Sequence, residues 1–232
     1  MRQSAVRGFI RLRDKRRVRV PKSAATHRGF RRWVTALRFP EHVHPTFVDG
    51  QMWFTMSPES LETHLKVKGE FTAALLRHIR DRDLGEGYCD GALLTNVAAR
   101  VSTEPDFQFV SWGASESGRV TLTRRRRRRD EFVEIVGIPD LVLEVVSDSS
   151  TRKDLVRLKA AYERAGIPEY WLVDARGEEM SFQILTLDGD SYRSSAPSEA
   201  PQSSRVLDAR FELRRALNRV GRFTYTLAIS ET

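Results

Sequence analysis

The stretch IPDLVLEVVSDSSTRKDLVRLKAAYERAGIPEYWLVD, from Ile138 to Asp174, decides the fold. Its first part reads as an apolar strand that carries two acidic residues, Asp140 and Glu144. Because side chains alternate between the two faces of a strand, these two carboxylates share one face. Ionised carboxylates in an apolar setting are costly unless a cation compensates them. The strand therefore predicts a nearby metal ion or lysine.

A helix is predicted next, and it can supply that lysine. Thr151 and Asp154 form a helix start signal, and Gly166 stands where a helix commonly ends. Between them, an apolar stripe follows the helical period at Leu155, Leu158, Tyr162 and Ala165. Lys159 flanks this stripe, so it is predicted to point toward the sheet and its carboxylates. The following EYWLVD run predicts a strand that is covered on both faces.

Local patterns predict two further elements. Residues 57–83 are predicted to form a helix, whose apolar face consists of Leu61, Leu65, Thr72, Leu75, Leu76 and Ile79. The dipeptide Asp188-Gly189 predicts the turn of a hairpin.

The order of several motifs allows a comparison with a known family. The motifs are Pro139-Asp140, Glu144, Ser147, Thr151, Asp154, Lys159, Tyr162 and the GIPEYWLVD run, with Asp49-Gly50, Ser57-Pro58, His64 and EPDFQFVS (Glu104 to Ser111) upstream. In this order they resemble the Uma-type family of putative restriction endonucleases, within the PD-(D/E)XK nuclease superfamily. The resemblance covers roughly Phe39 to Tyr192, and its later half is the specific part.

The resemblance implies an α/β (mixed α+β) fold with a restriction-endonuclease-like core, in which helices flank a central mixed β-sheet. It also implies that Asp106, which follows Pro105 at the head of a strand, binds metal as the superfamily's aspartate does. The superfamily's usual lysine would stand two residues after the strand glutamate, where this chain has Val146. Uma-type sequences take a lysine from the following helix instead, which here would be Lys159. Many relatives also carry an acidic residue where this chain has Thr46.

Composition limits the remaining possibilities. The 232 residues suit one domain with appendages. A single cysteine, Cys89, excludes an internal disulfide, and a reducing, cytoplasmic setting is expected. No apolar run approaches membrane-spanning length, so no membrane association is expected. The G-x-x-x-x-G-K-[ST], G-x-S-x-G and H-E-x-x-H patterns are all missing from the sequence, and no small-molecule cofactor is expected.

The positive charge is concentrated at the N-terminus. The net charge is +8, yet residues 1–38 hold 13 of the 39 basic and one of the 31 acidic residues, giving +12 there and −4 elsewhere. We therefore expect a basic N-terminal extension over residues 1–38 and a single nuclease-like domain over residues 39–232. The extension could neutralise nucleic-acid phosphates in a salt-sensitive way, or it could be a solvated, disordered arm. Both alternatives stay open.

A second basic run lies inside the expected domain. It consists of six arginines, Arg124, Arg125, Arg126, Arg127, Arg128 and Arg129. Because like charges repel, the run predicts an exposed, Arg-rich loop at about residues 113–131. Such a loop could clamp a DNA backbone through arginine–phosphate contacts, or it could be a solvated insertion that touches nothing.

These observations lead to a functional expectation with two rivals. We expect metal-assisted hydrolysis of DNA phosphodiester bonds, with one or two Mg²⁺ or Mn²⁺ ions held by Asp106 and Glu144 and assisted by Asp140. Lys159 would orient or deprotonate the attacking water, or stabilise charge at phosphorus. The first rival is a catalytically inactive DNA-binding protein that keeps the nuclease fold. The second is an interaction domain whose basic tail binds RNA or acidic partners. Proteins of this superfamily often act as dimers, which makes a homodimer a further expectation.

Overall fold

The computed structural model describes residues 3–4, 9–11, 17–36, 39, 43–55, 59–125, 128–148, 152–194, 196–198 and 200–231. Its α-helices are α1 (His27–Val34), α2 (Lys66–Asp81), α3 (Trp112–Glu116) and α4 (Arg152–Ala165). A short 3-10 helix, η1 (Lys22–Ala25), precedes α1, and a π-helical turn, η2 (Leu61–Leu65), leads into α2. None of the helices in the described part of the chain has the length and apolarity needed to span a bilayer.

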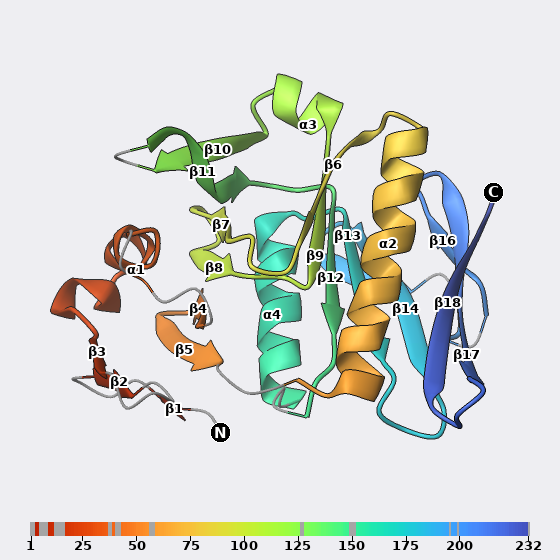
Figure 1. The fold of residues 1–232 in the computed structure, drawn as a ribbon. Helices are drawn as coiled ribbons and strands as arrows, with labels where there is room; N and C mark the ends of the chain where they lie inside the picture. Colours follow the sequence, from red (N-terminus) through yellow and green to blue (C-terminus); the bar gives the residue numbers. More distant parts are fainter. Residues whose placement is uncertain are drawn as a thin grey trace.

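The central sheet has six strands in the order β15-β14-β13-β12-β9-β6. In chain order these are β6 (Gly85–Cys89), β9 (Phe107–Ser111), β12 (Leu141–Val145), β13 (Glu169–Asp174), β14 (Ser181–Asp188) and β15 (Ser191–Ser194). Strands β12 and β13 are parallel and the other neighbouring pairs are antiparallel, so the sheet is mixed. Helices α2 and α4 flank it (Figure 1). The predicted fold class is confirmed.

Alternate residues of β12 face the two helices. Leu141 and Leu143 are fully buried in the core shared with Phe71 of α2. Val142 points the other way and packs with Tyr162 of α4. Burial on both faces explains why this strand is nearly all apolar in sequence. It also places the next residue of the second set, Glu144, on the α4 side.

The end of α4 follows its sequence signal. Gly166 adopts a positive φ of 75°, which a residue with a side chain rarely adopts. Its N–H donates to the Glu163 carbonyl at 3.0 Å, and Ile167 N–H donates to the Tyr162 carbonyl at 3.2 Å. These two bonds satisfy carbonyl groups that the helix end leaves unpaired. The chain then enters β13 directly, beside β12.

A second sheet lies beside the first and has the order β1-β5-β4-β8-β7-β11-β10. Its strands are β1 (Gln3–Ser4), β4 (His44–Val48), β5 (Gln51–Thr55), β7 (Leu94–Asn96), β8 (Val101–Thr103), β10 (Val120–Arg125) and β11 (Arg128–Gly137). Asp49 and Gly50 form the two-residue turn between β4 and β5, with positive φ values of 51° and 74°. Tight hairpins favour this conformation and this dipeptide. The Asp-Gly motif therefore has a structural role here.

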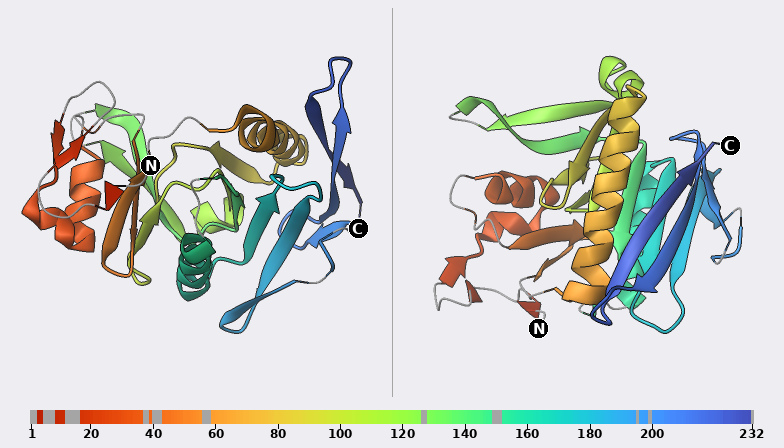
Figure 2. Two further views of the ribbon diagram at one scale, coloured as in Figure 1. Left: turned by 90° about the horizontal axis from the view of Figure 1, so that it is seen from below. Right: turned by 45° about the vertical axis from the view of Figure 1, so that its right-hand side comes forward.

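Two small sheets complete the fold. Strands β2 (Phe9–Arg11) and β3 (Arg17–Arg19) pair with each other near the N-terminus. Strands β16 (Gln202–Ser204), β17 (Ala209–Leu217) and β18 (Phe223–Ser230) form a three-stranded sheet beside α2 (Figure 2). Phe211 and Leu227 from that sheet join the core around Phe71. Helix α2 is thus covered on both sides, which rigidly positions the side chains of its first turns.

The expected extension over residues 1–38 is in part folded into the domain, contrary to the prediction. Phe30 of α1 is fully buried and packs against Phe47 of β4, with ring centroids 5.3 Å apart and the rings tilted by 44°. Arg31 donates two hydrogen bonds, of 2.7 and 2.9 Å, to the buried carboxylate of Glu134 on β11. Phe30 and Val34 are four residues apart and form one helix face. The prediction for this segment was based on its net charge, which does not reveal an amphipathic helix.

The expected loop at residues 113–131 is mostly regular structure, which corrects a second prediction. Helix α3 is followed by the antiparallel hairpin β10–β11, which projects from the body of the molecule (Figures 1 and 2). Arg124 and Arg125 lie in β10, and Arg128 and Arg129 lie in β11. Residues 126 and 127 fall outside the described residues. The arginine run therefore does not form the irregular loop that its charge predicted.

Candidate active site

A pocket of about 110 Å³ lies at the end of β12, beside η2, β4, β5 and the first turns of α4. Five carboxylic acid side chains contribute to its lining, namely those of Glu59, Asp90, Glu104, Asp106 and Glu144. The side chains of Trp53, Leu155 and Leu158 form an apolar part of the wall. So many acidic groups in one pocket require cations to balance them.

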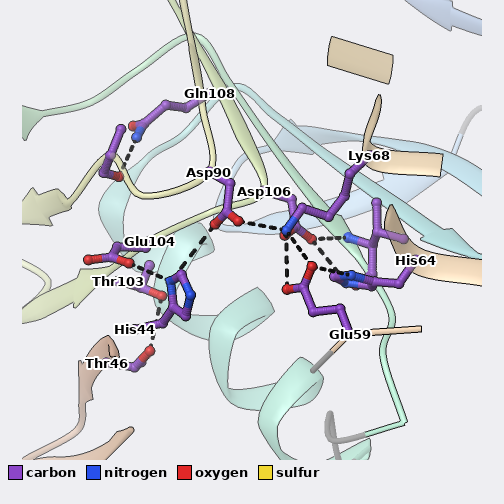
Figure 3. A network of polar contacts seen from close by, with 12 residues as sticks. His44, Thr46, Glu59, His64, Lys68, Asp90, Thr103, Glu104, Asp106 and Gln108 are labelled. Atoms are coloured by element: carbon purple, nitrogen blue, oxygen red, sulfur yellow. Dashed lines mark hydrogen bonds and ion pairs between the residues drawn. The ribbon is translucent and has the colours of Figure 1, made fainter. Parts of the chain in front are cut away.

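The ammonium group of Lys68, on α2, supplies positive charge beside three of these carboxylates (Figure 3). Its Nζ lies 3.1 Å from Asp106 Oδ1, 2.8 Å from Asp90 Oδ2 and 3.2 Å from Glu59 Oε2. The side chain is only 9% exposed. Burial acts to lower the pKa of Lys68, but the three carboxylates outweigh it and the pKa is raised above its usual range. Lys68 is therefore a fixed positive charge in contact with three of the carboxylates that line the pocket.

Asp106 connects Lys68 to the central sheet. It precedes β9, and its Oδ2 accepts a 2.7 Å hydrogen bond from the main-chain N–H of Val145 at the end of β12. Burial raises the pKa of Asp106, while the positive charges of Lys68 and His64 act in the opposite direction. The head of one strand and the end of its neighbour thus present Asp106 and Glu144 to the same pocket.

Glu144 is held by Tyr162, whose hydroxyl donates a 2.6 Å hydrogen bond to Glu144 Oε1. Burial and the nearby charge of Asp106 raise the pKa of Glu144 to about 8, although the bond from Tyr162 acts to lower it. At neutral pH the carboxyl group therefore retains its proton while no further cation is bound. A cation between Asp106 and Glu144 would relieve their repulsion, because an opposite charge favours the ionised form.

His64 of η2 contacts Glu59, as Lys68 does. Its Nε2 lies 2.9 Å from the Val145 carbonyl oxygen, and its Nδ1 lies 3.2 Å from Glu59 Oε2. Burial lowers the pKa of His64, but the contact with Glu59 and the charge of Asp106 outweigh it, so the net shift is upward. Two ring nitrogens that both face oxygen acceptors favour the imidazolium form. In return, His64 and Lys68 lower the pKa of Glu59 to about 2.

Asp140, a predicted metal ligand, is not part of the pocket. Its Oδ2 accepts a 2.8 Å hydrogen bond from Ser111 N–H, and its Oδ1 accepts one from the Arg119 guanidinium. Asp140 and Glu144 do share one face of the sheet, as strand alternation predicts. Four residues of strand span about 13 Å, however, so they stand at opposite ends of β12. Asp140 is therefore paired with Arg119, whereas Glu144 lines the pocket.

Lys159, the predicted catalytic lysine, also lies away from the pocket. Its Nζ donates a 2.6 Å hydrogen bond to Glu163 and stands 5.6 Å from the centre of the Tyr192 ring. Its neighbour Leu158 contributes to the pocket wall instead. Successive residues on a helix differ by about 100° in direction, so a lysine one position later faces another surface. The structure brings Lys68, not Lys159, to the predicted carboxylates.

Sequence reasoning could have found Lys68 by the argument applied to Lys159. The predicted helix over residues 57–83 has an apolar stripe through Leu65, Thr72, Leu75 and Ile79, and Lys68 falls on it by helical spacing. The remaining pocket residues carry no comparable signal. His44, Glu59, Asp90 and Glu104 come from chain segments that only the tertiary fold brings together.

The side chains of the pocket supply part of the ligand set of a divalent cation. Among the residues that the structure describes, no set of three or more His, Cys, Asp or Glu side chains is already arranged to hold an ion. Asp106 and Glu144 supply two hard oxygen ligands. Mg²⁺ commonly binds through one or two carboxylates and keeps several waters. At about 110 Å³ the pocket has room for more than one water. The residues therefore fit a partly hydrated Mg²⁺ or Mn²⁺, not a cage made of protein ligands alone.

Comparisons with known proteins agree with this geometry. Residues 30–217 match the model of the Uma2 family, which is described as putative restriction endonuclease. No curated protein matches the sequence. The fold is similar to the crystal structure of a putative nuclease belonging to DUF820 from Anabaena variabilis, with a TM-score of 0.56 and 14% identity over 78% of this chain and 90% of that chain. At this identity the likeness shows the fold alone. Because the family match covers most of the sequence, the resemblance is confirmed and the chain belongs to the Uma2 family of putative restriction endonucleases.

Proposed function

We propose that this protein hydrolyses DNA phosphodiester bonds at the pocket, as an endonuclease that depends on Mg²⁺ or Mn²⁺. The observation that carries the proposal is that Asp106 and Glu144 line one pocket of a nuclease-family fold, with the Lys68 ammonium group 3.1 Å from Asp106 Oδ1. Two carboxylates and an ammonium group are the residue types that hold a hard cation and stabilise the charge of a reacting phosphate.

Asp106 and Glu144 are the residues that would hold the cation. When bound there, the cation supplies Lewis-acid charge and makes a coordinated water a stronger nucleophile at neutral pH. Glu144 gives up its proton when the cation binds, because ligating carboxylates must be ionised. Tyr162 keeps Oε1 of Glu144 in place through its 2.6 Å hydrogen bond.

Lys68 takes the role that the sequence assigned to Lys159. In the protein alone it neutralises Asp106, Asp90 and Glu59. An ammonium group has three donors, so Lys68 can keep a carboxylate contact and donate to a non-bridging phosphate oxygen. It would thereby stabilise the negative charge that develops as the phosphodiester reacts.

The substrate assignment to DNA has a second support in the basic hairpin β10–β11. Arg124, Arg125, Arg128 and Arg129 stand in its two strands. Side chains of this kind bind phosphate oxygens through parallel hydrogen bonds and position a nucleic acid without reading its sequence. We propose that the hairpin contacts the DNA backbone outside the pocket.

The test is the nicking of supercoiled plasmid by the full chain, with Mg²⁺ or Mn²⁺ and against EDTA. Lys68→Met and Lys159→Met form a matched pair, because both remove one lysine charge from a helix. We expect metal-dependent nicking that falls at least about a hundredfold in Lys68→Met and less than about threefold in Lys159→Met. Far-ultraviolet circular dichroism checks that each variant is folded.

Other outcomes would change the assignment in distinct ways. If Lys159→Met is inactive and Lys68→Met is active, the lysine has been wrongly assigned. If the folded wild-type protein binds DNA yet nicks it with neither metal, the protein is an inactive DNA-binding member of the fold. One feature favours that alternative: Thr46 lines the pocket where many relatives carry an acid, and its hydroxyl lies 3.4 Å from that of Thr103.

A further inference from the structure

His44 and Glu104 form a second polar pair in the pocket, on the far side of Asp90 from Lys68 (Figure 3). His44 is the first residue of β4, and its Nδ1 lies 2.8 Å from Glu104 Oε2 and 3.9 Å from Asp90 Oδ1. Within the described part of the chain, Nε2 of the same ring has no hydrogen-bond partner. The imidazole is therefore held through one nitrogen, and the other is available to a ligand.

The carboxylate of Glu104 determines the chemical state of that ring. A carboxylate at Nδ1 keeps the proton there, orients the imidazole and stabilises the imidazolium form. The hydrogen bond to Glu104 raises the pKa of His44, and the charge of Asp90 adds to the increase, whereas burial and the charge of Lys68 oppose it. The net shift of the pKa is upward, toward the imidazolium form, in which Nε2 carries a proton.

Asp90 lies between the side chains of His44 and Lys68. Its Oδ2 is 2.8 Å from Lys68 Nζ, and its Oδ1 is 3.9 Å from His44 Nδ1. Lys68 adjoins Asp106, a proposed cation ligand, whereas His44 is one carboxylate farther away. Cleavage of a phosphodiester needs charge stabilisation at the phosphate and a proton at the leaving oxygen. The two groups are placed to serve these different needs.

We propose that His44 is the general acid that protonates the leaving oxygen, with Glu104 as its positioning residue; this rests on the proposed nuclease function. Water forms the new bond to phosphorus and loses one proton to solvent. The bond between phosphorus and the leaving oxygen breaks, and its electron pair stays on that oxygen. The oxygen takes the proton from His44 Nε2 and departs as an alcohol, and solvent then reprotonates the neutral imidazole.

The test compares two oligonucleotides that differ only in the leaving atom. The cleavage position is first mapped on ordinary DNA, and the leaving oxygen there is then replaced by sulphur. A thiolate departs without protonation, so the sulphur substrate does not need the acid. In single-turnover reactions with saturating Mn²⁺, His44→Gln should slow cleavage of the oxygen substrate by about a hundredfold. It should slow the sulphur substrate less than about tenfold, whereas Lys68→Met should slow both alike.

Matched variants separate the acid role from a structural one. His78→Gln is the control, because His78 of α2 donates from Nε2 to the Leu207 carbonyl oxygen at 3.0 Å and lies outside the pocket lining. Glu104→Gln keeps a hydrogen-bonding group but removes the charge, and it should show the same preference for the sulphur substrate in weaker form. If circular dichroism shows that His44→Gln is unfolded, the two substrates are compared with Glu104→Gln instead.

The results overturn the proposal in recognisable ways. Equal slowing of both substrates by His44→Gln, or no slowing of the oxygen substrate, would show that His44 is not the acid while leaving the nuclease function intact. Failure of the wild-type protein to cut ordinary DNA with Mg²⁺ or Mn²⁺ would instead defeat the proposed function itself.

Discussion

Replacing Lys68 by methionine should expose how strongly the pocket depends on this one charge. Methionine keeps much of the length and the apolar stem of lysine but has no charge. The change leaves Asp106, which is 12% exposed, without the ammonium group 3.1 Å from its Oδ1. Asp90 and Glu59 lose the same partner, but they are 36% and 29% exposed. Water can therefore compensate these two in part, and Asp106 least.

The magnitude follows from this difference in exposure. Removing one partner of a buried ion pair costs about 3 to 5 kcal/mol, because the other charge stays buried and uncompensated. Since two of the three carboxylates keep contact with water, we expect the lower end, about 3 kcal/mol. Lys159→Met is the control. Its ion pair with Glu163 is 37% exposed on the lysine side, and such pairs contribute about 1 kcal/mol or less.

The assay is urea unfolding at pH 7 without divalent cations, followed by a double-mutant cycle with Asp106→Asn. Asparagine can still accept the hydrogen bond from Val145 N–H but carries no charge that needs Lys68. The double variant should therefore be more stable than the sum of the single effects predicts, by at least about 1.5 kcal/mol. A loss below about 1 kcal/mol in Lys68→Met, or additive effects in the cycle, would refute the idea that Lys68 compensates a buried Asp106.

Three further predictions address other parts of the molecule. Because burial raises the pKa of Glu144 to about 8, the wild-type protein loses stability as the pH rises from about 4.5 through 8, whereas Glu144→Gln does not. Urea unfolding should show the variant gaining at least about 1 kcal/mol on the wild type between pH 5 and pH 8.5, and equal slopes would contradict the shift. Phe30→Ala should lower the free energy of unfolding by about 3 kcal/mol, because the ring is fully buried against Phe47. A loss under about 1 kcal/mol in urea would restore the view of residues 1–38 as a separable extension. Asp140→Asn should nick plasmid within about threefold of the wild-type rate, since Asp140 is bound by Arg119 away from the pocket. Complete loss of nicking by the folded variant would show that Asp140 belongs to the active site.

Local sequence patterns predicted much of the fold correctly. Strand β12 and helix α4 follow from an apolar run and a helical stripe that ends at Gly166. The dipeptide Asp188-Gly189 forms the predicted turn between β14 and β15, with Gly189 at a φ of 60°. These features depend on interactions between residues close in the chain, which is why a sequence can be read for them.

The candidate site was predicted only in part. Asp106 and Glu144 were identified, because one opens a strand after proline and the other is an acid inside an apolar strand. Asp140 was assigned to the same site because strand alternation gives the face of a side chain. Alternation does not give the distance along the strand, and the strand separates Asp140 from Glu144.

The choice between two lysines was beyond the reach of the sequence. Lys68 and Lys159 both occupy helices with an apolar stripe, and both have the spacing of a side chain that can turn inward. The sequence by itself determined the helices and the central strands, since these follow from local periodicity, and burial cost singled out Glu144, whereas Asp106 was predicted from the family resemblance. Only the tertiary structure decided that α2 crosses the end of β12 with Lys68 toward Asp106, while α4 directs Lys159 toward Glu163 and Tyr192. The reason is physical: the angle and position at which a helix packs on a sheet are set by the whole core, and they select which charged side chain meets the buried carboxylates.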